Sequence, residues 1–580
     1  MSLADDLAWW EQFRSSDAYK RLQTRPVAYF CAEFALLSNL KTYSGGLGIL
    51  AGDIVREAAA QRLPMVGVGL LYGQPAFGLE LAVDRGRPLT VKVPIQDRLV
   101  TVAAYRWPST LGRGWWSGGD RTVPVYLLTT DCADNDSRDR RLTDRLYPSD
   151  KERRLQQEII LGLGGLRLLE ALKIHPAIYH LNEGHSAFLA LEIIRHEMSE
   201  RLIGFNDALE LARQHIVFTN HTLVPAGQDI FSNDMVAANL VKYAEELAVP
   251  VDRLVDLGLI RESSLFSMTM VSLRLAGKAN AVSRLHAQKA AEIWRDHPME
   301  GITNGIHRQT WDRVANFSEH SENSENRNIG ESENLTLRSS EYSEFSNIWQ
   351  AHQHNKQLLL DKIRQTTGQS WPDDCLLLGW ARRFVGYKRP LSLFFDPVRL
   401  KTICTHPGRP VRLIISGNAH PGDAEGEKLL DHLVRSLLSS FGQETPGLRD
   451  IVAYLPNYGF DLARLLTSGC DVWLNTPVVG FEACGTSGMK AALNGVLPIS
   501  TKDGWMAEID PLGIGWIIDS DKVSDSLYQT LEHQVIPLYF DHRQEWIKNM
   551  ASARRLILDR FTTTRTLKEY VEKLYLSALI

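Results

Sequence analysis

Cysteine is scarce in this chain, which has six cysteines among 580 residues. None of them forms a C-x-x-C pair, and no set of cysteines and histidines has the spacing of a zinc site. We therefore expect free thiols in a reducing compartment, rather than a framework of disulfides, and we expect no metal centre.

Long apolar runs are also missing, and none that we find could cross a bilayer. The N-terminal stretch reads MSLADDLAWWEQFRSSD, which is acidic and amphipathic and does not match a secretory signal peptide. We expect a soluble, cytoplasmic protein with no membrane partner.

The chain has no large excess of either charge, because its net charge is −5. That balance does not suggest a nucleic acid or an acidic membrane as a partner. The composition, 44% hydrophobic and 23% charged, is ordinary for a globular enzyme. At this length one hydrophobic core is not enough, so two domains are expected.

Strand-like apolar runs alternate with amphipathic helical patterns, which predicts an α/β fold built from parallel βαβ units. The expected strands of the first half are 27–35, 64–72, 123–128, 177–181 and 215–220. The expected helices there are 47–61, 186–198 and 279–294. The expected strands of the second half are 375–381, 411–416, 452–455, 471–476 and 496–500, and a helical region is expected at 551–580.

One stretch breaks this alternation. Residues 317–347 are rich in Ser, Glu and Asn and poor in apolar residues, so they cannot form a core and are predicted to be a solvated insertion or linker. We therefore expect an N-terminal domain at 1–315, the insertion at 316–350, a C-terminal domain at 351–555 and a closing helix at 556–580.

The most informative stretch is 471–501, which reads DVWLNTPVVGFEACGTSGMKAALNGVLPIST. Its pattern predicts a strand, a loop of small residues, a helix and a second strand. Thr486 and Ser487 would lie with backbone N–H groups at the start of the helix, which suits a phosphate. Lys490 follows in the first turns. A lysine beside a phosphate cradle is what an enzyme needs to hold pyridoxal phosphate as a Schiff base.

A second glycine-rich stretch, SGGLGILAGD at 44–53, follows a strand and opens a helix. Its glycines let the backbone approach an anion closely. The stretch also satisfies G-x-G-x-x-A, but the next strand ends without the acid that would hold a ribose. A dinucleotide is therefore the poorer interpretation.

A basic loop, GWARRFVGYKRP at 379–390, follows a predicted buried strand. Its four charged members are Arg382, Arg383, Lys388 and Arg389. Like charges this close are costly unless an anion lies among them. The loop also stands at the edge where α/β sheets bind ligands, so it predicts an anion site.

Several blocks of the sequence resemble the α-glucan phosphorylases, in their short bacterial form, between about residues 27 and 575. They read YFCAEFALLSNLKTYSGGLGILAGD, LNEGHSAF, TNHTLVPAGQ, TNGIHRQTW, ARRFVGYKRP, NYGFDLA and FEACGTSGMKAALNG. The resemblance implies the GT-B architecture, with two Rossmann-like domains, an active-site cleft between them and a last helix that crosses back to the first domain.

The resemblance also implies a reaction. A hexosyl group would pass from an α-glucan or maltodextrin to inorganic phosphate, giving α-glucose 1-phosphate. The cofactor would be pyridoxal 5′-phosphate, and its phosphate group, not its aldehyde, would do the acid–base work through the substrate phosphate. A phosphate whose second pKa is near 6 suits this role at neutral pH.

Roles for individual residues follow from the matched blocks. The catalytic set would be Lys490, which anchors the cofactor, Arg383 and Lys388, which bind phosphate, and His221, which binds the sugar at the reaction centre. The other cofactor contacts would be Thr486, Ser487, Gly46, Arg382, Tyr458 and Trp311. The substrate contacts would be Glu482, Cys484, Gly485, Asn304, Tyr387 and Leu47. Glu183 and His185 are expected to be scaffold or to line the cleft.

Two positions depart from the family pattern, namely Ala35, where an aromatic residue often stands, and Gly459, where an arginine often stands. Three alternatives stay open. They are a nucleotide-sugar glucosyltransferase of the same fold, a glycoside hydrolase, for which the sequence marks no carboxylate pair, and a catalytically impaired glucan-binding homologue. The oligomeric state is also open, with a homodimer as one option.

Overall fold

The structure is a computed structural model. It describes residues 2–37, 40–75, 78–108, 123–224, 228–260, 263–315, 317, 337–419, 423–437 and 448–579, with the backbone alone at 337–346 and 436–437.

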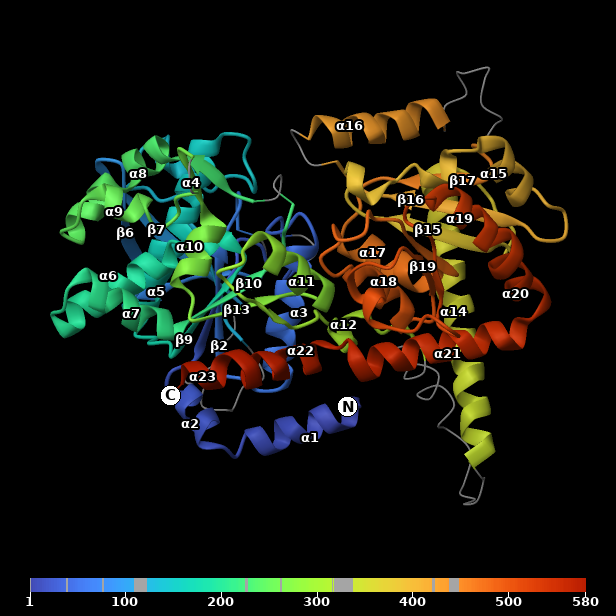
Figure 1. Ribbon diagram of the computed structural model, residues 1–580, viewed down its shortest axis with the longest axis horizontal. Coiled ribbons are helices and arrows are strands. Elements are labelled where there is room, and N and C mark those ends of the chain that lie inside the picture. The colour runs from blue at the N-terminus through green and yellow to red at the C-terminus, as the bar shows by residue number, and fades with distance from the viewer. Residues whose placement is uncertain are drawn as a thin grey trace. The chain divides into compact units, whose positions relative to one another are not determined.

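The chain divides into two compact units (Figure 1). The N-terminal unit comprises Leu3–Thr303 together with Thr563–Ile580, and the C-terminal unit comprises Asn304–Thr562 with the first two residues. The backbone therefore leaves the first unit after Thr303 and returns to it after Thr562. The domain boundaries expected from the sequence were residues 315 and 555 instead.

A ten-stranded sheet forms the centre of the N-terminal unit, in the order β14-β13-β10-β9-β1-β2-β8-β7-β3, with β6 paired to β7. The parallel strands are β1 (Val27–Phe30), β2 (Met65–Leu70), β8 (Val125–Thr129), β9 (Ile178–Asn182), β10 (Ile216–Asn220), β13 (Lys278–Ala281) and β14 (Glu300–Gly301). The antiparallel strands are β3 (Glu80–Leu81), β6 (Thr90–Ile95) and β7 (Arg98–Trp107). Short strand pairs stand outside this sheet, namely β4 (Val83–Asp84) with β5 (Arg87–Pro88) and β11 (Ile230–Ser232) with β12 (Leu265–Ser267).

Helices cover both faces of this sheet, so its central strands are buried throughout. Along β1, Ala28 and Phe30 belong to one apolar cluster, and Val27 and Tyr29 belong to the cluster on the other face. The helices within residues 3–303 are, in chain order, α1 (Leu3–Phe13), α2 (Asp17–Thr24), α3 (Gly46–Ala60), α4 (Lys151–Ile159), α5 (Gly165–Ala171), α6 (Leu189–Arg201), α7 (Phe205–His215), α8 (Asn233–Glu246), α9 (Val251–Val255), α10 (Met268–Leu275) and α11 (Arg284–Ile293).

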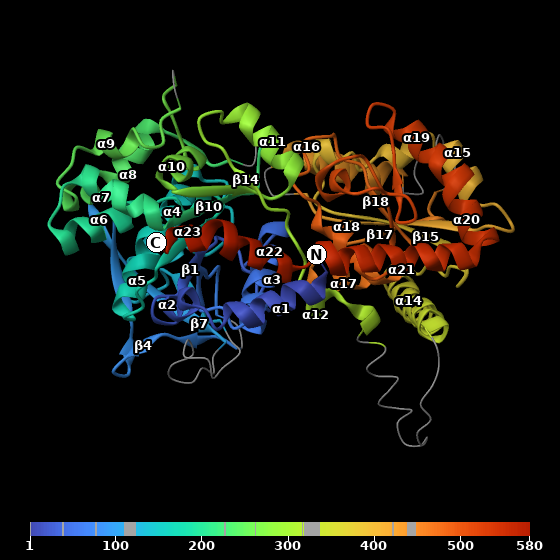
Figure 2. The ribbon, with the colours of Figure 1, turned by 60° about the horizontal axis from the view of Figure 1, so that its bottom comes forward.

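Two late helices, α22 (Thr563–Tyr570) and α23 (Leu576–Ala578), complete the N-terminal unit. Helix α22 lies beside α1 and α3 (Figures 1 and 2). The hydroxyls of Thr563 and Thr564 donate to the buried carboxylate of Glu57 at 3.0 and 2.9 Å. Lys568 pairs with the buried Asp6 at 3.0 Å. The segment thus supplies polar partners to acids buried in the rest of the unit.

A six-stranded parallel sheet forms the centre of the C-terminal unit, in the order β17-β16-β15-β18-β19-β20. The strands are β15 (Leu376–Ala381), β16 (Val411–Ser416), β17 (Val452–Leu455), β18 (Val472–Asn475), β19 (Leu497–Ser500) and β20 (Trp516–Ile517). The helices are α12 (Arg308–Trp311), α14 (Leu337–Thr367), α15 (Pro397–Cys404), α16 (Ala424–Asp431), α17 (Phe460–Gly469), α18 (Thr486–Leu493), α19 (Val523–Thr530), α20 (Ile536–Asp541) and α21 (Arg543–Arg560).

Both units are therefore mixed α/β with parallel sheets, as the alternating pattern predicts. The helix expected at 279–294 is wrong in its first part. Residues Lys278–Ala281 form β13 and pair in parallel with β10, and the helix begins at Arg284 because the side chain of Ser283 accepts the N–H of His286 at 3.1 Å.

Most of the expected insertion lies outside the described residues, and α14 begins inside it at Leu337. Within the part of the chain that the structure describes, no helix combines the length and the apolar character needed to span a membrane.

Candidate active site

The stretch 471–501 folds as a strand, a loop, a helix and a strand, namely β18, α18 and β19, in agreement with its sequence pattern. Gly485 stands at the start of α18 in the left-handed region, with φ of 81°. A side chain at Gly488 would place its Cβ 3.0 Å from Nε1 of Trp505. The loop can therefore approach a ligand through backbone and small side chains.

Lys490 projects from α18 into a buried position, where its side chain faces an aromatic ring. Its Nζ lies 4.1 Å from the centroid of the Trp311 ring. The amide of Asn494 donates to the carbonyl oxygens of both Trp311 and Lys490, at 2.9 Å each. Asn494 therefore ties α12 to α18 and fixes the two predicted cofactor residues beside each other.

Glu482 lies between two of the predicted basic residues. Its carboxylate is 2.9 Å from Nη1 of Arg382 and 3.2 Å from Nζ of Lys388. Burial alone would raise the pKa of Glu482, but the charges of Lys388 and Arg382 outweigh burial and hold the pKa below its usual value. Arg382 also donates to the hydroxyl of Ser487 at 3.1 Å, which joins the basic loop to the start of α18.

The four charged residues of the basic loop therefore have different protein partners. Arg382 and Lys388 share a protein carboxylate, whereas Arg383 is exposed. The guanidinium of Arg389 donates to the carbonyl oxygens of Thr476 and Ser520, at 2.7 and 2.5 Å, so it braces the loop. Arg389 itself has φ of 49°.

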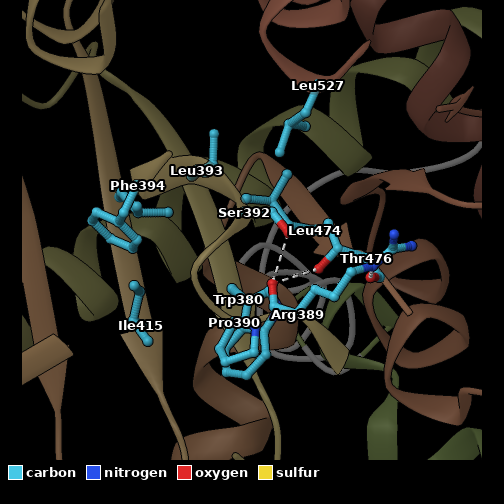
Figure 3. A pocket seen from close by; sticks show the side chains of 11 residues that line it. Trp380, Arg389, Pro390, Ser392, Leu393, Phe394, Ile415, Leu474, Thr476 and Leu527 are labelled. Carbon is cyan, nitrogen blue, oxygen red and sulfur yellow. Dashed lines mark hydrogen bonds between the residues drawn. The ribbon is translucent and has the colours of Figure 1, made fainter. Parts of the chain in front are cut away.

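A small cavity of about 10 Å³ lies beneath Arg389, whose carbonyl oxygen accepts hydrogen bonds from Ser392 and Thr476 (Figure 3). It has room for about one water and none for a sugar. A hollow of about 1440 Å³ lies elsewhere in the unit, against Trp349 and Trp516, and none of the predicted site residues lines it.

Four further predicted residues of the C-terminal unit are Tyr458, Tyr387, Cys484 and Asn304. Burial raises the pKa of Tyr458 to about 12, so its phenol stays protonated. The ring of Tyr387 lies 5.4 Å from Nζ of Lys388. Cys484 is buried, and its carbonyl oxygen accepts the N–H of Trp505 at 3.0 Å. Asn304 is also buried, at the point where the chain enters this unit.

The glycine-rich loop of the N-terminal unit begins α3, with Gly46 as its first residue and Leu47 half-buried behind it. Glu33, just beyond β1, holds this loop. Its carboxylate accepts the N–H groups of Ser44 and Gly45, at 2.7 and 3.3 Å, and the hydroxyl of Tyr147. This role of Glu33 was not predicted from the sequence, because the contacts join segments far apart in the chain.

His221 follows β10 and is held from β9 by two adjacent residues. Asn182 lies with Oδ1 2.7 Å from Nε2 of His221, and the carboxylate of Glu183 accepts the backbone N–H of His221 at 2.9 Å. Burial lowers the pKa of His221 to about 3, so the imidazole is neutral at pH 7. Asn182 was not predicted as a site residue, and Glu183 was expected to be scaffold or cleft lining.

The predicted residues thus form two sets. The C-terminal unit holds Lys490, Trp311, Arg382, Arg383, Lys388, Glu482, Tyr387, Tyr458, Cys484, Gly485, Thr486, Ser487 and Asn304. The N-terminal unit holds Gly46, Leu47 and His221. Each set stands at the carboxyl ends of parallel strands and at helix starts, which is where α/β sheets bind ligands. The class that these features define is an α/β enzyme with a buried lysine and two loops suited to anions.

Comparison with known proteins gives the family. A model of the carbohydrate phosphorylases matches residues 129–513, and the chain belongs to that family. It is 37% identical to a maltodextrin phosphorylase of Thermococcus litoralis, over 96% of this chain and 71% of the relative. It is 32% identical to a glycogen phosphorylase of Mycobacterium tuberculosis, over 98% and 73%, and 31% identical to one of Aquifex aeolicus, over 96% and 87%.

Proposed function

We propose that this protein carries out phosphorolysis of α-1,4-glucan, releasing α-glucose 1-phosphate with inorganic phosphate as the acceptor. The observation that carries the proposal is the buried Lys490 against Trp311. On the same helix, Ser487 accepts a hydrogen bond from Arg382, which contacts the ion pair of Glu482 and Lys388. Family membership and the names of the relatives, maltodextrin and glycogen phosphorylase, support the same substrate class.

The donor set of α18 fits pyridoxal 5′-phosphate. A buried lysine lies against an aromatic face, and hydroxyls and N–H groups gather at a helix start. Lys490 would hold the cofactor covalently, Trp311 and Tyr458 would line its ring, and Thr486 and Ser487 would hold its phosphate with Arg382 and Gly46. Bound there, the cofactor would supply a phosphate able to exchange a proton near neutral pH.

We assign the substrate phosphate to Arg383 and Lys388. Arg383 is exposed, so it can meet an incoming anion without breaking a buried contact. Lys388 is half-buried and already neutralises a carboxylate, so a bound phosphate would share it with Glu482. This arrangement lets two cations hold a doubly charged ligand close to the acid that contacts the sugar.

The sugar would be held by hydroxyl contacts from both units. Glu482, Asn304 and Tyr387 belong to one set, with the backbone of Cys484 and Gly485. Leu47 and His221 belong to the other. This assignment requires the GT-B arrangement, in which the carboxyl ends of the two parallel sheets face a common cleft.

The rival functions predict different chemistry. A nucleotide-sugar glucosyltransferase needs neither the buried lysine nor pyridoxal phosphate. An impaired glucan-binding homologue would bind glucan without turnover. A Cβ added at Gly459 would meet only a carbonyl oxygen, 3.7 Å away at Asn457, so the missing arginine leaves space rather than a distorted backbone.

The test is an assay of glucose 1-phosphate release from a ladder of maltodextrins and from glycogen, with and without phosphate. The same preparation is scanned for bound pyridoxal phosphate. Phosphate-dependent release with bound cofactor is the expected result. Transfer from a nucleotide sugar, or release of free glucose without phosphate, would overturn the proposal.

A further inference from the structure

Glu183 has a backbone conformation that a side chain strongly disfavours. It directly follows β9, with φ of 77° and ψ of 165°. That region is occupied almost exclusively by glycine, because a Cβ clashes with the flanking peptide groups there. A glycine follows at Gly184, yet the strained position itself carries a glutamate, and its side chain is buried.

The carboxylate of Glu183 binds main-chain groups on two elements. One oxygen accepts the N–H of Gly184 at 3.0 Å, and the other accepts the N–H of His221 at 2.9 Å. The N–H of Glu183 itself donates to the carbonyl oxygen of Thr219 at 3.0 Å. The side chain therefore reaches from the end of β9 to the first residue after β10 and sets the backbone of His221.

A second contact orients the ring of His221. The amide nitrogen of Asn182 donates to Sγ of Cys31 at 3.2 Å, so its Oδ1 faces His221 as an acceptor. Nε2 of His221 must then carry the hydrogen, and Nδ1 keeps a lone pair. With a pKa lowered to about 3 by burial, the ring stays neutral and Nδ1 can accept a hydroxyl proton in a hydrogen bond.

We propose that Glu183 is a positioning residue for the reaction: its strained backbone carries the carboxylate that, with Asn182, fixes His221 as a neutral acceptor aimed by Nδ1 at a sugar hydroxyl. This inference rests on the proposed function for its substrate. A glycine at 183 would relieve the strain, but it would leave the N–H of His221 without its acceptor. The strain is thus retained at the cost of stability.

The test compares Glu183→Gly with wild-type holoenzyme. We expect an equal or higher Tm, unchanged cofactor content and unchanged KM for phosphate, with kcat reduced about tenfold or more, because a misplaced contact at the reacting sugar slows the chemistry. Glu183→Gln keeps an acceptor oxygen and should recover part of kcat.

A matched control is Leu202→Gly. Leu202 also has a positive φ, 54°, but it lies at the end of α6 and is 90% exposed. This variant should raise Tm in the same way and leave kcat unchanged. If Glu183→Gly kept the wild-type kcat, or lost Tm and kcat together, the positioning role would be wrong.

A readout that needs no turnover separates this inference from the proposed function. In ¹⁵N-histidine-labelled wild type, NMR should show His221 with its hydrogen on Nε2 at pH 7, and Glu183→Gly should shift or broaden those signals. If wild type released no glucose 1-phosphate from any glucan, the proposed function would fail while this measurement still decided the geometry. A charged His221, or one with its hydrogen on Nδ1, would overturn the inference.

Discussion

The ammonium group of Lys490 lies over the ring of Trp311, 4.1 Å from its centroid, in the interior of the C-terminal unit. Buried lysines are rare unless a partner compensates the charge. The π face of tryptophan supplies part of that compensation. A lysine held in this way is oriented before any ligand arrives, which is what a covalent anchor requires.

The first prediction therefore concerns Lys490. Borohydride reduction of the holoenzyme should fix pyridoxal phosphate on Lys490, as read by peptide mapping, and Lys490→Ala should lose the cofactor and the activity. Lys502 is exposed, so Lys502→Ala is the matched control and should keep both. Modification of a different lysine in the wild-type holoenzyme would contradict the assignment.

A second prediction separates the residues of the basic loop. Arg383→Ala should raise the KM for phosphate about tenfold or more, at wild-type cofactor content, because an exposed charge that contacts the substrate is lost. Arg389→Ala should instead lower the Tm, because it removes the side chain that braces Thr476 and Ser520. If Arg383→Ala lost the cofactor and kept its phosphate KM, the assignment of Arg383 to the substrate phosphate would be wrong.

The third prediction concerns a buried ion network that attaches α14 to the sheet. Asp471 accepts from Lys356 at 2.8 Å and from the backbone of Leu377 at 2.7 Å, and it lies 2.9 Å from His352. Asp471→Asn leaves the Lys356 charge buried without its counter-charge, so the free energy of unfolding should fall by about 3–5 kcal/mol.

Urea denaturation followed by tryptophan fluorescence measures this loss. Asp361→Asn is the control, because Asp361 pairs with Arg364 on the surface and should cost about 0–1 kcal/mol. Equal effects of the two substitutions would show that the buried network does not stabilise the unit.

The fourth prediction is a pH dependence of stability that originates at Glu183. Burial raises its pKa from 4.5 to about 7, against the N–H bonds from Gly184 and His221. Between about pH 5 and pH 7 the unfolded chain has lost this proton and the folded chain keeps it, so stability falls as pH rises, by roughly 3 kcal/mol at most.

Glu183→Gln cannot ionise and should lack this contribution. Relative to wild type, its Tm should therefore increase as the pH is raised from about 5 to about 7.5. Asp229 and His185 also lie near Glu183, but they are present in both proteins and cancel in the comparison. A Tm difference that is constant with pH would show that the folded protein does not keep a proton on Glu183 between about pH 5 and pH 7.

The sequence predicted the local units well where apolar period and loop chemistry agreed. The stretch from Asp471 to Thr501 is the clearest case, because a buried strand, a glycine loop and a short helix each carry their own signal. The strand at Lys278–Ala281 was missed because Lys, Ala and Asn are poor strand formers, and pairing with β10 overrides that preference.

The supporting residues of the site could not be predicted for a different reason. Glu33, Asn182, Glu183 and Asn494 act through hydrogen bonds to segments that are distant in the chain, and no local pattern encodes such contacts. The strained backbone of Glu183 was also invisible, since the sequence gives no sign that a glutamate occupies a conformation typical of glycine. The resemblance gave the residues that are expected to contact ligands, and the structure adds the residues that hold them in place.

The position of α22 has a consequence for how the protein is made. A ribosome delivers residues 3–303 before the C-terminal unit, but the partners of Glu57 and Asp6 arrive after that unit, with Thr563, Thr564 and Lys568. The surface of residues 3–303 that α22 covers therefore stays exposed until the whole C-terminal unit has been synthesised. A chain that ended at residue 562 would lack α22, so its N-terminal unit would keep that surface exposed. Completion of the N-terminal unit therefore depends on synthesis of the C-terminal unit.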